Sequence, residues 1–182
     1  MKHLKVVLMG IMVLLMFVVA GCGTKSEEDV FVGKWIMQNP SSYPPVNLIV
    51  LDIQKKDKNF QIKKDVYYYD EQKTKDERLI FTNDVHLEFL NTLNMKPYEI
   101  QANLTNKELY TENGKYIYNE KDDTLTYDKS IYARYKNEDQ FKEKIQELKQ
   151  KKEEEIKNRT KNASMFKYYY DKFEFDDSIL NK

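Results

Sequence analysis

The chain has 182 residues, and its 30 basic and 30 acidic side chains give a formal net charge of zero. Proteins that bind nucleic acid usually carry an excess of basic residues, and this chain has none. Three of its 5 glycines, Gly23, Gly33 and Gly114, lie beyond residue 22, which is too few for a glycine-rich phosphate-binding loop.

One apolar segment opens this otherwise polar chain. Lys2 and Lys5 precede the apolar run 6–20, which is the pattern of a secretory signal. The run ends in the sequence VAGC at 19–22, where small residues stand before Cys22, the one cysteine of the chain. This segment resembles a bacterial lipoprotein signal with its lipobox. The resemblance implies cleavage before Cys22 and attachment of a diacylglyceryl group to its sulfur.

The resemblance also predicts where the protein resides. Residues 1–21 are expected to be the removed signal peptide, and residues 22–30 the lipidated cysteine and a small, charged tether. Two or more acyl chains anchor a protein stably, so the expected partner is the extracytoplasmic face of the cell membrane, reached through Cys22. An uncleaved signal-anchor helix is the alternative, but 6–22 is short of the roughly 20 apolar residues that span a bilayer. A buried core helix would not explain the basic start.

Removal of the signal changes the composition. The remaining chain has 28 basic and 30 acidic residues, a net charge of −2. With Cys22 acylated no thiol remains, which excludes disulfides, thiolate metal sites and cysteine nucleophiles.

Between residues 31 and 136 the apolar residues recur with a period of two, which predicts strands. In the clearest case, Val85, Leu87 and Phe89 alternate with His86 and Glu88. Further segments with this alternation are 60–68, where Lys64 is the exception, and 98–104.

Tight turns punctuate these strands. Asn113-Gly114 is the strongest short hairpin signal, because a type I′ turn needs positive φ at both central positions. A two-residue loop there would pair Leu109 with Tyr118 and Thr111 with Tyr116. Many short strands joined by tight turns predict a mainly β domain over 31–136, an antiparallel meander of about 8–10 strands that closes into a barrel or folds as a sandwich.

The pattern changes over 137–182. Residues 137–161 contain no glycine or proline, and Asn137 and Gln140 can form a capping box, so a C-terminal α-helix is predicted. It is interpreted as a solvated helix packed along one side, with a partner-binding helix as the alternative. The aromatic tail 165–175 is expected to add a last strand or to pad the helix against the barrel, with an exposed tail as the alternative. The apolar stripe of this helix consists of Phe141, Ile145 and Leu148, is interrupted at Lys152 and resumes at Ile156.

The first predicted strand contains Gly33-Lys34-Trp35, which resembles the G-x-W signature of lipocalins. An irregular loop at 38–45 and Arg134 on the last predicted barrel strand are similar to lipocalin features. The resemblance implies a lipocalin-like barrel in which Gly33 allows close chain passage beneath Trp35 and Arg134 stacks on the indole. These roles are structural. A cystatin-like α+β fold is the alternative, but there the long helix precedes the strands.

The sequence offers little for catalysis. His86 is the one histidine beyond the signal and stands on the polar face of a predicted strand, so we expect a surface residue and no histidine metal site. Asp122-Asp123 falls in a predicted turn, where solvated charge is the ordinary explanation. We therefore expect no enzyme, no cofactor and no metal.

Two functional hypotheses remain. The first is a non-catalytic binding module that holds a small hydrophobic or amphiphilic ligand inside the barrel. The second is an interaction protein whose surface engages an envelope protein or a wall polymer. The 14 tyrosines suit either, because a phenol ring offers apolar area with a polar tip. A ligand-binding barrel should contain a void, whereas an interaction module should have a filled interior.

Overall fold

The computed structural model describes residues 26–41, 45–79, 81–161 and 166–181. The chain divides into two compact units, Met1–Val30 and Phe31–Lys182. In the described part of the first unit, the backbone N–H of Ser26 donates to the Asp29 carboxylate, and that of Asp29 donates to the Ser26 hydroxyl, 3.4 and 3.3 Å away. The predicted signal peptide and Cys22 lie outside the described residues.

Eight strands of the second unit form a closed antiparallel barrel. Each pairs with the next strand along the chain, and β8 pairs with β1 to complete the ring. With β9, the described residues form nine strands, and a C-terminal helix follows the barrel. The prediction of a mainly β, antiparallel meander barrel followed by a helix is confirmed. The barrel strands are β1 Gly33–Met37, β2 Asn47–Lys56, β3 Asn59–Leu79, β4 Asp84–Thr105, β5 Glu108–Thr111, β6 Gly114–Asn119, β7 Thr124–Tyr127 and β8 Ser130–Arg134.

The barrel interior follows from the strand register. Trp35 of β1 lies opposite Leu51 of β2 and Arg134 of β8. Because successive side chains point to opposite faces, every second residue along each strand faces the interior. The buried side chains on this face are Trp35, Met37, Ile49, Leu51, Ile53, Phe60, Ile62, Ala102, Leu109, Tyr116, Leu125 and Tyr132.

The hairpin between β5 and β6 differs from the prediction. Leu109 pairs with Tyr116 and Thr111 with Gly114, so the loop is Glu112-Asn113 and the predicted register is wrong by two residues. Gly114 is the first residue of β6, with φ +149°, and Asn113 is not among the residues with positive φ.

Gly114 has a packing role instead of a turn role. A Cβ built at Gly114 would lie 3.0 Å from the Tyr127 hydroxyl oxygen, and this hydroxyl donates to the Asn113 carbonyl at 2.9 Å. The glycine therefore lets the Tyr127 ring lie across the start of β6.

Gly114→Ala is expected to lower the free energy of unfolding by about 1–3 kcal/mol, since the new Cβ combines an unfavourable φ with a clash. Urea denaturation followed by circular dichroism measures the loss. In a Tyr127→Ala background the same substitution should cost clearly less, because the clash is gone. An equal cost in both backgrounds would contradict this account.

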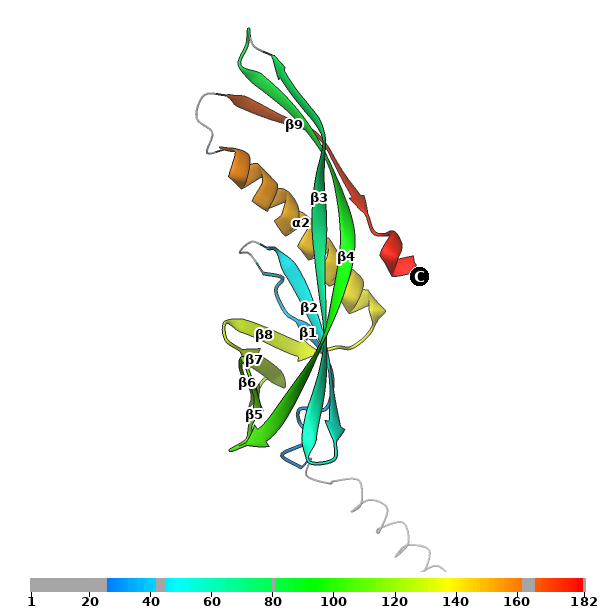
Figure 1. The fold of residues 1–182 in the computed structure, drawn as a ribbon, viewed down its shortest axis with the longest axis vertical. Coiled ribbons are helices and arrows are strands. Elements are labelled where there is room, and N and C mark those ends of the chain that lie inside the picture. The colour runs from blue at the N-terminus through cyan, green and yellow to red at the C-terminus, as the bar shows by residue number, and fades with distance from the viewer. Residues whose placement is uncertain (1–25, 42–44, 80, 162–165, 182) are drawn as a thin grey trace, which may run out of the picture. The chain divides into compact units, whose positions relative to one another are not determined.

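The strands β3 and β4 extend beyond the barrel. They pair with each other from Phe60 to Leu79, whereas β2 reaches only to Tyr68 on β3 and β5 pairs only with 103–105 of β4. The strand β9, Lys167–Asp176, adds to β4 in parallel at 84–92. We call residues 69–79, 84–92 and β9 together the arm; Figure 1 shows β3 and β4 continuing past the short strands into it.

The helix α2, Glu138–Lys161, packs on the barrel wall and on the arm. Its start is capped, because the Asn137 side chain accepts a hydrogen bond from the Gln140 N–H at 3.0 Å. The Gln140 side chain accepts from the Lys136 N–H at 2.8 Å, so the predicted capping box is only half formed.

A second hydrophobic core joins the helix to the arm. Val85, Leu87 and Phe89 of β4 pack against Ile156 of α2, and side chains of β9 close the cluster. The aromatic tail thus adds a last strand, as expected, and its side chains pack the helix against the arm instead of against the barrel. The partly buried β9 side chains in this core are Tyr168, Tyr170 and Phe173.

Candidate functional site

The three structural residues singled out from the sequence come together at one end of the barrel. Trp35 is fully buried, and its indole N–H donates to the Phe31 carbonyl at 2.9 Å. The Arg134 guanidinium lies 3.7 Å from the centre of the indole. Gly33 has φ +117°, and a Cβ there would approach Arg134 Nη1 to 3.4 Å. The geometry is a cation–π stack with glycine beside it.

Asp123 belongs to the same cluster and was missed by the sequence analysis, which treated it as solvated turn charge. Arg134 Nε lies 3.2 Å from its carboxylate, and the Tyr118 hydroxyl donates to it at 3.0 Å. Arg134 also donates to the Val32 carbonyl at 2.7 Å. The positive φ of Asp123, 46°, is the one local signal of a special turn position, and the sequence does not display it.

Aromatic rings pack the barrel interior around Trp35. Phe31 lies edge-to-face with Phe60 and Tyr118, at centroid distances of 6.5 and 6.2 Å. Farther along, Tyr116 contacts Tyr132 at 6.2 Å, and both are 2% exposed. These rings are buried and packed against one another in the barrel interior.

Burial of these phenols couples stability to alkaline pH. Burial raises the pKa of Tyr116 above its ordinary value of 10.0 and that of Tyr132 to about 12. A raised folded-state pKa contributes stability that is complete below pH 10 and is lost as the pH rises from 10 to 12 and beyond, because the unfolded phenol ionises first.

We expect the free energy of unfolding to fall above pH 10, by at most about 1.4 kcal/mol per pH unit for each buried tyrosine. Tyrosinate absorbance and circular dichroism recorded together should show the last tyrosines ionising as the fold is lost. Tyr132→Phe removes one contribution and is the matched control. Ionisation of all 14 tyrosines near pH 10 with an unchanged fold would contradict the prediction.

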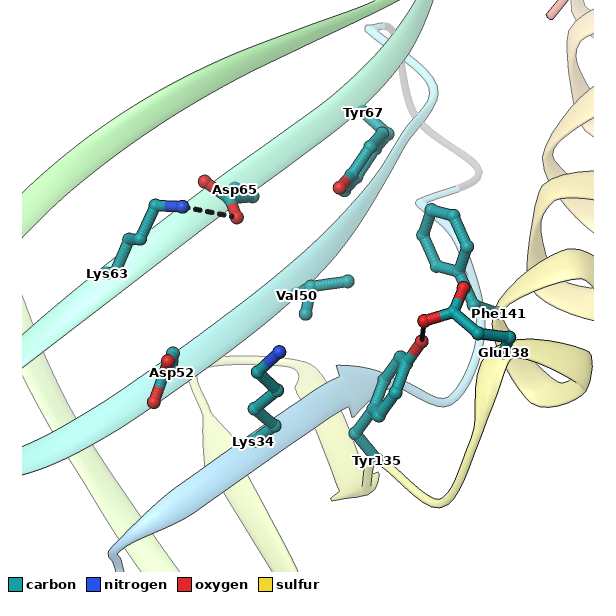
Figure 2. A pocket seen from close by; sticks show the side chains of 9 residues that line it. All are labelled: Lys34, Val50, Asp52, Lys63, Asp65, Tyr67, Tyr135, Glu138 and Phe141. Atoms are coloured by element: carbon teal, nitrogen blue, oxygen red, sulfur yellow. Dashed lines mark hydrogen bonds and ion pairs between the residues drawn. The ribbon is translucent and has the colours of Figure 1, made fainter. Parts of the chain in front are cut away.

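A pocket of about 190 Å³ lies on the outer wall of the barrel, under the start of α2. Its residues come from β1, β2, β3, α2 and the segment between β8 and α2, and Figure 2 shows them facing a common space. We call it the outer-wall pocket. Its lining is Lys34, Val50, Asp52, Lys63, Asp65, Tyr67, Tyr135, Glu138 and Phe141.

Three aromatic rings form part of this lining. Tyr67 contacts Phe141 edge-to-face at 5.0 Å, and the Tyr135 hydroxyl donates to Glu138 at 2.9 Å. Burial raises the pKa of Tyr67, and the Asp65 and Glu138 carboxylates raise it further. Burial likewise raises the pKa of Tyr135 to about 12, with help from its bond to Glu138. The phenols are therefore neutral donors at physiological pH.

Charged groups of both signs complete the outer-wall pocket. Lys63 pairs with Asp65 Oδ2 at 3.3 Å, whereas Asp65 Oδ1 is buried without a hydrogen-bond partner. Lys34 Nζ lies 5.9 Å from the centre of the Tyr135 ring. On β1 to β3 the charged residues of the pocket alternate with buried core residues. In the sequence they therefore look the same as side chains that face solvent.

The remaining candidate from the sequence, His86, is placed among charged and aromatic side chains. His86 lies on the arm, where its Nδ1 is 3.0 Å from an Asp171 oxygen and its ring stacks on Tyr169 at 4.9 Å. Lys75 Nζ lies 3.3 Å from the same Asp171 carboxylate. Within the ranges that the structure describes, no group of three or more His, Cys, Asp or Glu residues is placed to hold a metal ion.

Comparison with known protein families, with curated proteins and with solved structures finds no match to this chain. Among the described residues, no helix has the length and apolar character needed to cross a bilayer.

Proposed function

We propose that the chain is a lipid-anchored, non-catalytic binding protein of the cell envelope that recognises its partner through its outer surface. The lipobox at 19–22 supports the anchor, and the short charged segment that follows suits a tether. The partner class is another envelope component, a protein or a wall polymer.

The observation that carries this proposal is the packed barrel interior. Trp35, Phe60 and Tyr132 are at most 2% exposed and contact neighbouring rings or strands. An internal carrier of hydrophobic ligands needs a cavity of about 300 Å³ or more lined by apolar groups. The filled interior therefore favours surface recognition over the hypothesis of an internal hydrophobic ligand.

Cys22→Ser is expected to abolish lipid attachment, because serine lacks the thiol that forms the thioether. Full-length protein expressed in bacteria fed an alkyne-bearing fatty acid should carry the label and sediment with membranes, and the variant should do neither. Ser26→Ala, which keeps the lipobox, is the control. Retention of the label by Cys22→Ser would refute the anchor.

A fluorescent apolar dye tests whether the barrel interior binds a hydrophobic ligand. Titration of N-phenyl-1-naphthylamine into the chain from Thr24 onward should give no saturable enhancement, because the interior offers it no space. Saturable binding that is lost on filling the interior further, for example in Ala102→Leu, would instead support an internal ligand.

A further inference from the structure

We propose that the outer-wall pocket binds a small zwitterion of amino-acid size, with the ligand ammonium on Asp65 and the ligand carboxylate on Lys34. This inference goes beyond the proposed function, because it adds a small-molecule site on the outer wall to the recognition of a larger partner. Figure 2 shows both side chains at this pocket.

The side of the pocket that would bind the ligand ammonium consists of the Asp65 carboxylate and the neutral Tyr67 phenol. Asp65 Oδ1 is buried with no hydrogen-bond partner, and a buried carboxylate oxygen without a donor is unfavourable. The Tyr67 hydroxyl also makes no hydrogen bond to any described residue. A ligand ammonium would donate to the Asp65 carboxylate, whose side chain is 18% exposed, and would lie beside the Tyr67 and Phe141 rings.

The cationic side of the pocket is Lys34. Its ammonium contacts the Tyr135 ring and forms no ion pair with the described part of the chain. Lys63, the other lysine of the pocket, is already paired with Asp65. A ligand carboxylate would therefore find one lysine ready to bind it.

The opposite charges and the size of the pocket select the ligand class. A simple amine would leave Lys34 as an unpaired like charge beside it. A simple carboxylate would face three acidic side chains, because Asp52 and Glu138 line the pocket together with Asp65. The volume of about 190 Å³ suits a small ligand, since pockets for drug-sized ligands are roughly 300–1,000 Å³. Val50 and Phe141 offer apolar surface to a short aliphatic side chain.

The test is a titration of the ¹⁵N-labelled chain from Thr24 onward, which contains all of the described residues, followed by amide chemical shifts. The probes are glycine and L-valine, with isobutylamine and isovalerate as the singly charged controls. Both amino acids should shift the amides of Val50, Asp65 and Tyr67 saturably. Each singly charged probe should bind at least about tenfold more weakly, because it lacks one charged contact.

Two variants assign the contacts. Asp65→Asn and Lys34→Gln should each weaken L-valine binding by about tenfold or more, in line with the loss of one charge-assisted hydrogen bond. Lys121→Gln, on an exposed turn, is the matched charge control and should bind L-valine as the parent chain does. The amide spectrum itself reports whether each variant is folded.

Two results would overturn the inference. The first is no saturable shift with either amino acid, or shifts that both variants leave unchanged; the proposed function would survive this result. The second is a ligand-dependent shift of the Trp35 indole N–H without shifts at the outer-wall pocket. Because Trp35 is enclosed in the barrel, that result would place the ligand inside and overturn the proposed function as well.

Discussion

Trp35→Ala is expected to lower the free energy of unfolding by about 3–5 kcal/mol, the usual cost of removing a buried tryptophan. The indole is fully buried, donates to the Phe31 carbonyl at 2.9 Å and carries the Arg134 guanidinium on its face at 3.7 Å. Its loss opens a cavity where β1 and β8 meet, removes the stacking surface for Arg134 and leaves a buried carbonyl without its donor.

Urea denaturation followed by circular dichroism measures this effect. Ile131→Ala, on the outside of β8 and 44% exposed, is the control and should change stability by no more than about 0.5 kcal/mol. Arg134→Lys should give an intermediate loss of about 1–2 kcal/mol, because an ammonium neither stacks flat on the indole nor spans the same acceptors. A loss below about 1 kcal/mol for Trp35→Ala would mean that the barrel does not close around this residue.

Glu71→Met is the second large effect and is expected to lower the free energy of unfolding by about 2–3 kcal/mol. Glu71 on the arm lies 3.3 Å from Lys152 and 2.6 Å from Arg159 of α2, and Lys152 is 9% exposed. Removing one partner of a buried ion pair leaves the other charge in a poorly solvated place, which costs about 3–5 kcal/mol when nothing else compensates. Glu155, 3.2 Å from Lys152, reduces the penalty.

The double variant Glu71→Met/Lys152→Met should recover most of the loss, because apolar side chains of similar volume often replace a buried ion pair without cost. Glu174→Gln, in the exposed pair with Lys172, is the control and should cost less than about 1 kcal/mol. If the double variant loses more stability than the sum of the two single-variant losses, Glu71 and Lys152 do not compensate each other's charge.

The local patterns of the sequence predicted most of the barrel. Period-two alternation located the strands, because one face of each strand is buried and the other is not. The G-x-W segment and Arg134 marked the first and last barrel strands, and Trp35 and Arg134 are direct cross-strand neighbours in the structure. Asn137 correctly marked the start of the helix through its capping side chain.

Features that depend on long-range pairing were not predictable. The alternation at 85–89 predicted a strand, but it could not tell that its apolar face packs on Ile156 of α2 instead of inside the barrel. Lys152 seemed to interrupt the apolar stripe of the helix, and its partner Glu71 is 81 residues away in the chain. Asn113-Gly114 was read as a turn because the contact between Gly114 and Tyr127 is invisible in the sequence.

The outer-wall pocket was also beyond sequence analysis. Its residues span Lys34 to Phe141, and on each strand they occupy the positions that normally face solvent. Only the pairing of β1, β2 and β3, with the start of α2 above them, brings these side chains around one space.

Native mass spectrometry of the chain from Thr24 onward, purified without detergent and combined with an organic extract of the same sample, tests the central claim most directly. A packed barrel that acts through its outer surface predicts the mass of the polypeptide without a bound amphiphile, and an extract free of one. An amphiphile retained reproducibly at one per chain would contradict surface recognition and restore the barrel interior as the binding site.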